Sequence, residues 1–269
     1  TEAFQDGVFA AVDAMSGEVY LEPDADVRRS VRRKRDAFVK DRQDAARYLS
    51  ESGSLRDGTH VDVGLNIGSC AETDAIRYCD FIGLFRTEFL YMQTDRLPDE
   101  EAQFSAYRDV LQRAGGKPVT IRTLDVGGDK MLPCLSLPKE ENPFLGCRAL
   151  RFCLRNRDLF LTQLRAILRA SVYGKLWVMF PMVGSMDDLR AAKGALAEAM
   201  RMLDQRGILY DKKIKTGVMI EIPSAALMAA DIAAECDFAS VGTNDLCQYL
   251  NAADRMNPDV KTYYQSFSP

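Results

Sequence analysis

Charged and amide side chains stand directly after short apolar runs at several points of this 269-residue sequence. These positions are Arg86 after residues 81–85, Arg122 after 118–121, Glu221 after 217–220, and Asn244 and Asp245 after 238–242. Short apolar runs are typical of buried parallel strands, and in a β/α barrel the carboxyl ends of the strands meet at the face that carries the chemistry. Such a set would suit an anionic, phosphate-bearing substrate held with a divalent cation.

Each of these residues also has a purely structural interpretation. An arginine at a barrel rim can form an ion pair, and the sequence offers Glu88, Asp125 and Asp129 as partners. Glu221 can cap or pair locally, and Asp245 belongs to a Thr-Asn-Asp sequence that is typical of a helix start. In the functional interpretation, Glu221 and Asp245 bind Mg²⁺ together, and substrate oxygens complete the coordination.

The apolar runs alternate with helical patterns from residue 57 onward, which predicts a parallel sheet covered by helices. Strands are expected at 61–67, 81–86, 118–124, 176–180, 214–220 and 237–242. Helices are expected at 71–78, 99–114, after Pro143 or Gly146, and at 157–173, 186–205, 224–235 and 245–252. The predicted fold is α/β: residues 57–269 form a (β/α)8 TIM barrel with about six of its eight strands.

The residues before this alternation have a different character. Two short apolar stretches flank Ser16-Gly17, which predicts a hairpin within residues 1–22. Residues 24–51 lack Gly and Pro and space their apolar side chains on one helical face, so a helical linker is expected over residues 23–56. Its run of basic residues between 28 and 35 would suit nucleic acid, but the acidic residues that follow favour a solvated helix face.

Composition and charge narrow the class of protein. The formal net charge of −4 provides no global field for nucleic acid, so no nucleic-acid partner is expected and an anion site must be local. No apolar run approaches the ~20 residues of a membrane helix, and no membrane insertion is expected. Seven cysteines without a C-x-x-C pair indicate reduced thiols and a cytoplasmic protein. The single histidine, His60, is expected to be a loop or strand-edge residue.

Four longer motifs resemble enzyme I of the bacterial phosphoenolpyruvate:sugar phosphotransferase system. They are GLFRTEFLYM (83–92), RTLDVGGDK (122–130), ENPFLGCR (141–148) and GTNDLCQY (242–249). Motifs of this length, in this order, are specific for phosphoenolpyruvate-utilising enzymes. The Gly-Gly-Asp-Lys loop favours enzyme I, whereas the segment IEIPS at 220–224 is somewhat nearer to phosphoenolpyruvate synthase.

The resemblance assigns roles to individual residues. It implies that phosphoenolpyruvate is bound by Arg86, Arg122 and Arg255, with further contacts from Asn244, Asp245, Arg148 and Lys130. The implied metal ligands are Glu221 and Asp245, for Mg²⁺ or alternatively Mn²⁺. Arg255 enters this set through the resemblance alone, because spacing does not select it.

The resemblance also implies a function for a longer protein. The phosphoryl group would pass from phosphoenolpyruvate to a histidine on a separate swivelling domain and then to the phosphocarrier protein HPr, the first step of sugar uptake. Residues 1–22 resemble the end of that swivelling domain. The phosphohistidine and a proton-donating cysteine would lie outside this sequence, so the chain alone is expected to be inactive. A homodimer is also implied.

Two other interpretations remain open from the sequence. In the first alternative to enzyme I, the chain would serve as the phosphoenolpyruvate-binding domain of a phosphoenolpyruvate synthase or a pyruvate phosphate dikinase. It would also serve as a non-catalytic module that senses phosphoenolpyruvate without turnover. Supplying the histidine domain in trans separates these cases, because only the catalytic fragment then hands the phosphoryl group on.

Overall fold

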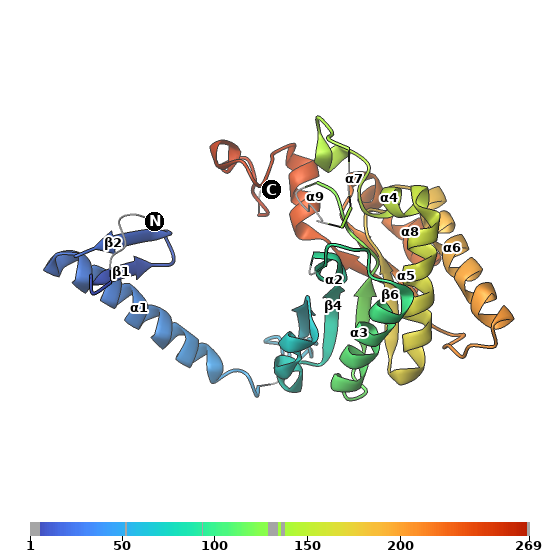
Figure 1. Cartoon of the computed structure of the whole chain (residues 1–269), viewed down its shortest axis with the longest axis horizontal. Helices are drawn as coiled ribbons and strands as arrows, with labels where there is room; N and C mark the ends of the chain where they lie inside the picture. The colour runs from blue at the N-terminus through green and yellow to red at the C-terminus, as the bar shows by residue number, and fades with distance from the viewer. Residues whose placement is uncertain (1–5, 52, 93, 129–133, 136–137, 268–269) are drawn as a thin grey trace. The chain divides into compact units, whose positions relative to one another are not determined.

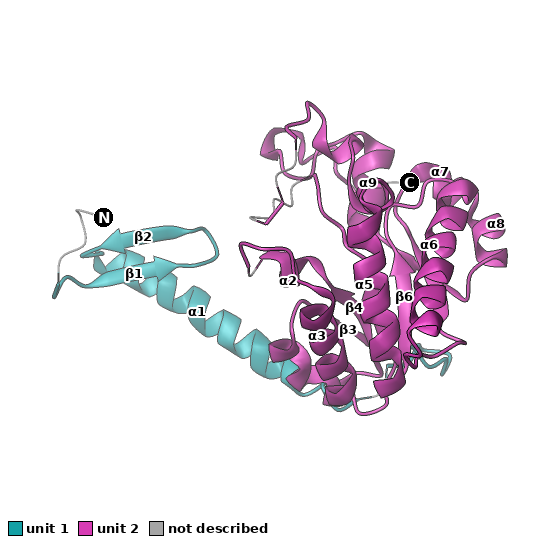
Figure 2. Cartoon of the chain, turned by 45° about the vertical axis from the view of Figure 1, so that its right-hand side comes forward, with its two compact units in different colours: residues 1–61 teal, residues 62–269 magenta. Residues whose placement is uncertain are grey.

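The computed structural model describes residues 6–51, 53–92, 94–128, 134–135 and 138–267. The chain divides into two compact units, residues 1–61 and 62–269, which Figure 2 shows in different colours. The boundaries predicted from the sequence, after residues 22 and 56, separate a domain remnant, a linker and a barrel, and that assignment stays a prediction.

The first unit consists of a hairpin and one long helix. Strands β1 (Ala10–Asp13) and β2 (Glu18–Leu21) pair antiparallel, as the sequence predicted. The turn between them is held by Asp13, whose carboxylate accepts hydrogen bonds from the backbone amides of Met15 and Ser16. Helix α1 (Ala25–Ala46) begins after Asp24, whose side chain caps two amides of the first turn.

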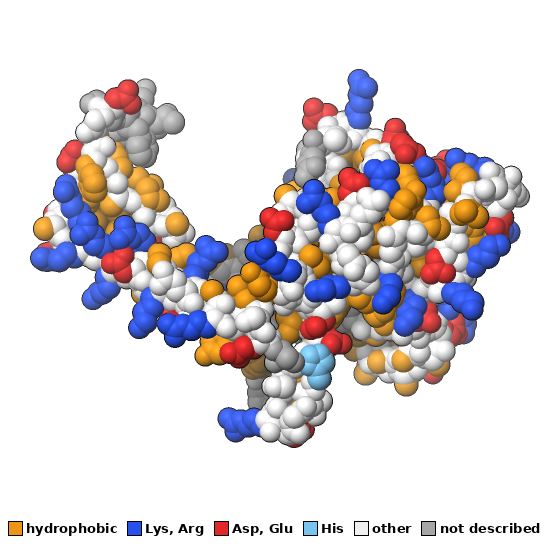
Figure 3. Space-filling view, turned by 90° about the horizontal axis from the view of Figure 1, so that it is seen from below, with side chains coloured by type: hydrophobic (Ala, Val, Ile, Leu, Met, Phe, Trp, Pro, Cys, Tyr) orange, Lys and Arg blue, Asp and Glu red, His pale blue; other side chains and the backbone are white. Residues whose placement is uncertain are grey.

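Helix α1 carries the basic run that the sequence analysis singled out. Lys and Arg side chains are numerous along it in Figure 3, with acidic side chains between them. Arg29 pairs with Asp26, Arg35 with Asp36, and Arg47 with Asp44, all at the surface. Its basic charge is therefore interrupted by local ion pairs, which is the pattern of a solvated helix face.

The second unit is built on a six-stranded parallel sheet whose strands follow one another in chain order (Figure 1). The strands are β3 (Gly64–Ile67), β4 (Phe81–Arg86), β5 (Val119–Arg122), β6 (Leu176–Phe180), β7 (Lys215–Ile220) and β8 (Phe238–Val241). The sheet curls into a half-barrel, which confirms the prediction of a partial TIM barrel within the described residues. The predicted strand at 61–67 begins three residues later, because Val63 donates its amide to the side chain of Asp80 instead of to a strand.

Helices and 3₁₀ helices connect or follow the strands of this sheet. In chain order they are the 3₁₀ helix η1 (Cys70–Tyr78), α2 (Glu88–Met92), α3 (Glu100–Arg113), η2 (Pro143–Leu145), α4 (Ala149–Arg155), α5 (Arg157–Ala170), η3 (Ser171–Tyr173), α6 (Met186–Gln205), α7 (Pro223–Leu227), α8 (Ala229–Ala234), α9 (Thr243–Asn251) and η4 (Pro258–Val260). Helix α5 packs between α3 and α6. The expected helix at 224–235 is broken at Met228, whose backbone leaves the helical region (ψ 20°).

Side chains of β5 alternate between the two faces of the sheet, and this alternation positions the site. Val119 and Ile121 are fully buried in the apolar core under the helices. The alternate residues of the strand, Thr120 and Arg122, line a cavity on the opposite, concave face. A strand has a side-chain period of two, so the residue that ends β5 must point into the half-barrel.

None of the helices in the described residues combines the length and the apolar composition that a bilayer crossing requires.

Candidate functional site

The concave face of the half-barrel contains a cavity of about 800 Å³, which extends from the starts of strands such as β4 and β8 to their carboxyl ends. Its wall includes six of the residues selected from the sequence: Arg86, Arg122, Glu221, Asn244, Asp245 and Arg255. Arg86 and Arg122 end β4 and β5, and the other four follow β7 and β8. Strand register aligns Arg86 with Arg122 as neighbouring partners. Lys130 lies outside the described residues.

Arg122 is buried among carboxylates. Its Nη2 lies 2.6 Å from Glu88 Oε1 and 3.1 Å from Asp125 Oδ2, and only 5% of the residue is exposed. Burial opposes the charge, but Asp125, Glu88 and Glu221 outweigh it and raise the pKa of Arg122. Two of the ion-pair partners named from the sequence, Glu88 and Asp125, are therefore in place. Structural pairing does not exclude ligand binding, because the guanidinium still faces the cavity.

Arg148 is fully buried behind the cavity wall and links two carboxylates that are far apart in sequence. Its Nη2 lies 3.1 Å from Asp125 Oδ1, and its Nη1 lies 3.1 Å from Asp245 Oδ1. Gly127 permits this arrangement: it has a φ of +103°, and a Cβ there would lie 2.6 Å from Cβ of Arg148. Arg148 thus cross-links the top of the half-barrel, and through Asp245 it also supports the cavity wall.

Arg255 completes the cationic side of the site. Its Nη1 lies 3.7 Å from Asp245 Oδ1, and its guanidinium stacks 5.8 Å from the ring centre of Phe144. Asp245 therefore sits between two guanidinium groups, those of Arg148 and Arg255. Asn244 lines the cavity beside it and accepts a hydrogen bond from the hydroxyl of Tyr264 on its side-chain oxygen, at 3.3 Å.

Arg86 differs from the other arginines of the site. In the part of the chain that the structure describes, its guanidinium makes no ion pair, and its Nε is buried without a hydrogen-bond partner. The group stacks on the ring of Phe89, 4.6 Å from the ring centre, and lines the cavity. Arg86 is half-buried, and its buried Nε has no partner, so an anion bound in the cavity would compensate its charge.

Glu221 is a buried acid of the site whose pKa is raised. It is 1% exposed, and its Oε1 accepts a hydrogen bond of 2.6 Å from the amide of Met182. Burial and the neighbouring charge of Asp125 raise its pKa to about 7, against the opposing effect of Arg122. Its other oxygen faces Gly242, where an added Cβ would lie only 2.7 Å away. Glycine therefore keeps this carboxylate oxygen uncovered.

The donor set around Glu221 and Asp245 fits a hard divalent cation. Carboxylate oxygens from two chain segments face one cavity, and a cation there would offset the excess negative charge that Glu221 experiences from Asp125 and Asp245. The cavity wall contains neither cysteine nor histidine among the described residues. Mg²⁺ and Mn²⁺ match these oxygen ligands.

Tyr249 belongs to the site, although reasoning from the sequence did not select it. Its hydroxyl accepts a hydrogen bond from Arg148 Nη1 at 3.3 Å and donates one of 2.5 Å to the carbonyl of Phe144. The available signal was its spacing: on helix α9, Tyr249 lies four residues after Asp245 and therefore on the same helix face. Tyr264, which contacts Asn244, lies in an irregular segment and gave no comparable signal.

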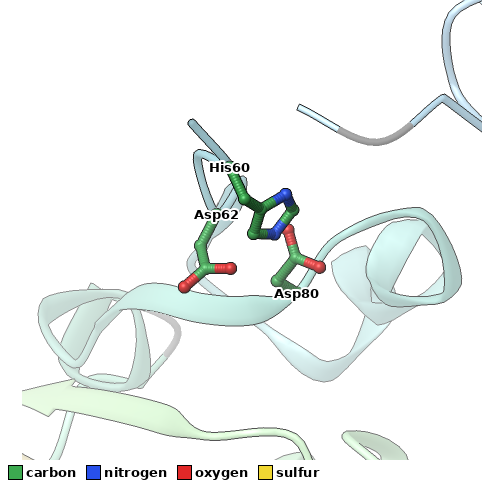
Figure 4. Close-up of side chains that lie close together, drawn as sticks. All are labelled: His60, Asp62 and Asp80. Atoms are coloured by element: carbon green, nitrogen blue, oxygen red, sulfur yellow. The ribbon is translucent and has the colours of Figure 1, made fainter. Parts of the chain in front are cut away.

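Exposed acidic residues at the opposite ends of the strands do not belong to this site. Asp62 and Asp80 precede β3 and β4, and both appear in Figure 4 with His60, which is part of the first unit. Asp80 is engaged in local structure, because its carboxylate accepts the amide of Val63 at 2.8 Å. The arginine, carboxylate and amide side chains of the cavity instead lie at or after the carboxyl ends of the strands, as expected for the functional face of a barrel.

Comparison with known proteins agrees with this geometry. The model of the family described as PEP-utilising enzyme, PEP-binding domain, matches residues 42–269. The phosphoenolpyruvate-protein phosphotransferase of Priestia megaterium is 47% identical over 270 residues, which cover 100% of this chain and 47% of that protein. The protein of the same name from Bacillus subtilis (strain 168) is 45% identical over 271 residues, covering 100% of this chain and 48% of the relative.

The chain thus spans about half the length of the curated relatives it matches. Both of these relatives are named phosphotransferases, in agreement with the resemblance to enzyme I. The family match covers the whole second unit, including every described residue that lines the cavity. The chain belongs to the PEP-utilising enzymes and contains their PEP-binding domain.

Proposed function

We propose that this chain binds phosphoenolpyruvate in the half-barrel cavity and presents its phosphoryl group for transfer. In the longer protein the acceptor is a histidine of a separate domain, and the phosphocarrier protein HPr is the next acceptor in sugar uptake. We further propose that residues 1–22 belong to that separate domain, that residues 23–56 are the linker, and that the protein acts as a homodimer in the cytoplasm. The observation that carries the proposal is Arg86, a half-buried cavity guanidinium whose Nε is buried without a hydrogen-bond partner and which has no described carboxylate partner.

The balance of charge supports an anionic ligand accompanied by a cation. Among the described residues, the site contains four guanidinium groups and four carboxylates: Arg86, Arg122, Arg148, Arg255, Glu88, Asp125, Glu221 and Asp245. Ligand and metal would therefore enter a site whose own charges compensate each other. The phosphate and carboxylate of phosphoenolpyruvate suit guanidinium forks, and Glu221 with Asp245 would hold Mg²⁺ or Mn²⁺.

The residues of the chain contribute mainly orientation and charge stabilisation in this proposal. Bound Mg²⁺ would neutralise charge on the phosphate oxygens. Arg86, Arg122 and Arg255 would fix the substrate from one side of the cavity, and the amide of Asn244 would donate to it, because Tyr264 occupies its side-chain oxygen. Arg148 would hold Asp245 in position from behind. Phosphoryl transfer depends largely on such positioning and on charge already in place.

Phosphoenolpyruvate is expected to bind only in the presence of Mg²⁺ or Mn²⁺, because the carboxylates Glu221 and Asp245 otherwise repel the incoming anion. Calorimetry with the metal and with a chelator measures this dependence. Equal affinity in the two conditions contradicts the metal assignment.

Adding the histidine domain in trans tests phosphoryl transfer. Phosphorylation of that domain supports the proposal, and binding without transfer favours a sensing module.

Arg86→Met is expected to weaken phosphoenolpyruvate binding by roughly 10- to 100-fold, the range for loss of a charge-assisted hydrogen bond. It should not lower the free energy of unfolding, because the described chain offers Arg86 no ion pair to lose. Calorimetry and urea unfolding of the same protein measure the two effects. Arg157→Met, which removes an exposed guanidinium paired with Glu198, is the control and should leave binding unchanged. A large loss of stability in Arg86→Met contradicts this interpretation.

A further inference from the structure

A buried polar network lies behind the cavity wall, between the sheet and helices α3 and α5. Its members are fully or almost fully buried: Thr87, Tyr91, Gln103, Tyr107 and Gln163. None of them lines the cavity, and spacing in the sequence selected none of them. Five polar side chains in an otherwise apolar layer are costly unless each one is hydrogen-bonded.

The donors and acceptors of Gln163 are fixed by its neighbours. Its Oε1 must accept the amide of Leu124, at 2.9 Å, so its Nε2 is the donor. That nitrogen donates to the hydroxyl of Thr87 at 3.1 Å and to that of Tyr107 at 3.3 Å. The Thr87 hydroxyl in turn donates to the carbonyl of Arg122 at 3.0 Å.

These contacts join the two segments that carry the charged site residues. Thr87 stands between Arg86 and Glu88 after β4, and the carbonyl of Arg122 ends β5. Leu124, whose amide Gln163 accepts, immediately precedes Asp125. One side chain of helix α5 thus sets the spacing between the loop after β4 and the loop after β5.

The outer part of the network has no such connection. Gln103 accepts the hydroxyls of Tyr91, at 3.2 Å, and Tyr107, at 3.1 Å, and donates to the carbonyl of Pro98 at 2.9 Å. It is almost as deeply buried as Gln163 and belongs to the same cluster, but its side-chain hydrogen bonds within the described residues go to Tyr91, Tyr107 and Pro98 and not to a strand end. The chain therefore offers a matched pair of buried glutamines at the two ends of one network.

We propose that Gln163 is a positioning residue for the substrate site. It holds the backbone amide of Leu124 directly and the backbone carbonyl of Arg122 through the hydroxyl of Thr87, so that Arg86 and Arg122 converge on one ligand. This inference rests on the proposed binding of phosphoenolpyruvate in the cavity. An apolar side chain of equal size would fill the same space without burying polar atoms, so packing alone does not require glutamine here. A satisfied buried network fixes one arrangement of the groups attached to it.

The test compares Gln163→Met with Gln103→Met in the 269-residue chain. Both changes remove buried hydrogen bonds and keep the side-chain size, so both should lower the free energy of unfolding. Only Gln163→Met should weaken Mg²⁺-dependent phosphoenolpyruvate binding, by roughly tenfold, the effect of losing one well-placed contact. Gln103→Met should bind like the unchanged protein. Equal affinity losses in both variants, or none in Gln163→Met, overturn the inference.

A spectroscopic readout separates positioning from general loosening. The side-chain Nε–H signal of Arg122 in a nitrogen-15 NMR spectrum is assigned by its disappearance in Arg122→Lys. It should shift in Gln163→Met and stay in place in Gln103→Met, and the opposite pattern contradicts the inference. If Gln163→Met does not fold, Thr87→Val applies the same criteria, since it removes the hydroxyl that connects Gln163 to Arg122.

Failure of this inference is distinguishable from failure of the proposed function. If the unchanged chain binds no phosphoenolpyruvate with Mg²⁺, the proposed function is wrong, and the positioning role falls with it. If the unchanged chain binds and Gln163→Met binds equally well, the function stands and Gln163 has a structural role only.

Discussion

Replacing Arg148 with methionine is expected to lower the free energy of unfolding by about 3–5 kcal/mol, the cost of breaking a buried ion pair from one side. Arg148 is 0% exposed and faces both Asp125 and Asp245 at 3.1 Å. Methionine fills similar space but removes one of the guanidinium groups that face Asp125, which is also fully buried and pairs with Arg122 as well. Urea unfolding monitored by tryptophan fluorescence and circular dichroism gives the comparison.

Two further variants identify the cause of that loss. Adding Asp125→Asn to Arg148→Met should recover part of the stability, because it removes the charge of one of the two carboxylates that Arg148 compensated. Arg190→Met removes an exposed guanidinium paired with Glu235 and should change stability by less than about 1 kcal/mol. If Arg148→Met costs no more than Arg190→Met, the buried cluster does not stabilise the fold.

The metal-free protein is expected to lose stability as the pH rises from about 4.5 to about 7, and Glu221→Gln should abolish this loss. Burial and the charge of Asp125 raise the pKa of Glu221 from its ordinary value of 4.5 to about 7. Within that window the folded state retains a proton that the unfolded chain has released, so stability falls with increasing pH. A shift of this size corresponds to about 3 kcal/mol.

Urea unfolding across this pH window, with a chelator present, measures the effect. Glu221→Gln should match the unchanged protein at the acidic end and be more stable at the neutral end, because the amide never ionises and keeps an oxygen for the amide of Met182. Glu198→Gln, at the surface, is the control for a general change in charge. Parallel curves for Glu221→Gln and the unchanged protein would show that this carboxyl group titrates normally.

Much of the fold was predictable because its signals are local. The apolar runs at 81–86 and 176–180 became β4 and β6 with the expected bounds, and alternation with helices predicted a parallel sheet. Capping residues mark helix starts in the same way: Asp99 accepts from the amide of Ala102, and Ser185 from that of Asp188. Strand periods and caps involve residues within a few positions of one another, so the sequence contains them directly.

Predictions that depended on tertiary packing were less accurate. The helix expected at 71–78 is a 3₁₀ helix, and the one expected at 224–235 is interrupted at Met228. Strand β3 begins at Gly64 because the carboxylate of Asp80, seventeen residues later in the chain, accepts the amide of Val63. Intrinsic propensity is a weak signal wherever such remote contacts compete with it.

The sequence by itself determined which residues stand at or after the carboxyl ends of strands and therefore share one end of the half-barrel. As predicted, one cavity is lined by Arg86, Arg122, Glu221, Asn244 and Asp245. Only the tertiary structure decided how these charges are compensated. Arg148 meets Asp245 across 97 residues of sequence, and Gln163 meets Thr87 across 76. Arg86 has no carboxylate partner among the described residues, and the pKa of Glu221 is raised to about 7, which favours its neutral form. The interaction energy between charges and the pKa of each group depend on burial and on the distance to other charges. Both are set only when remote segments pack together.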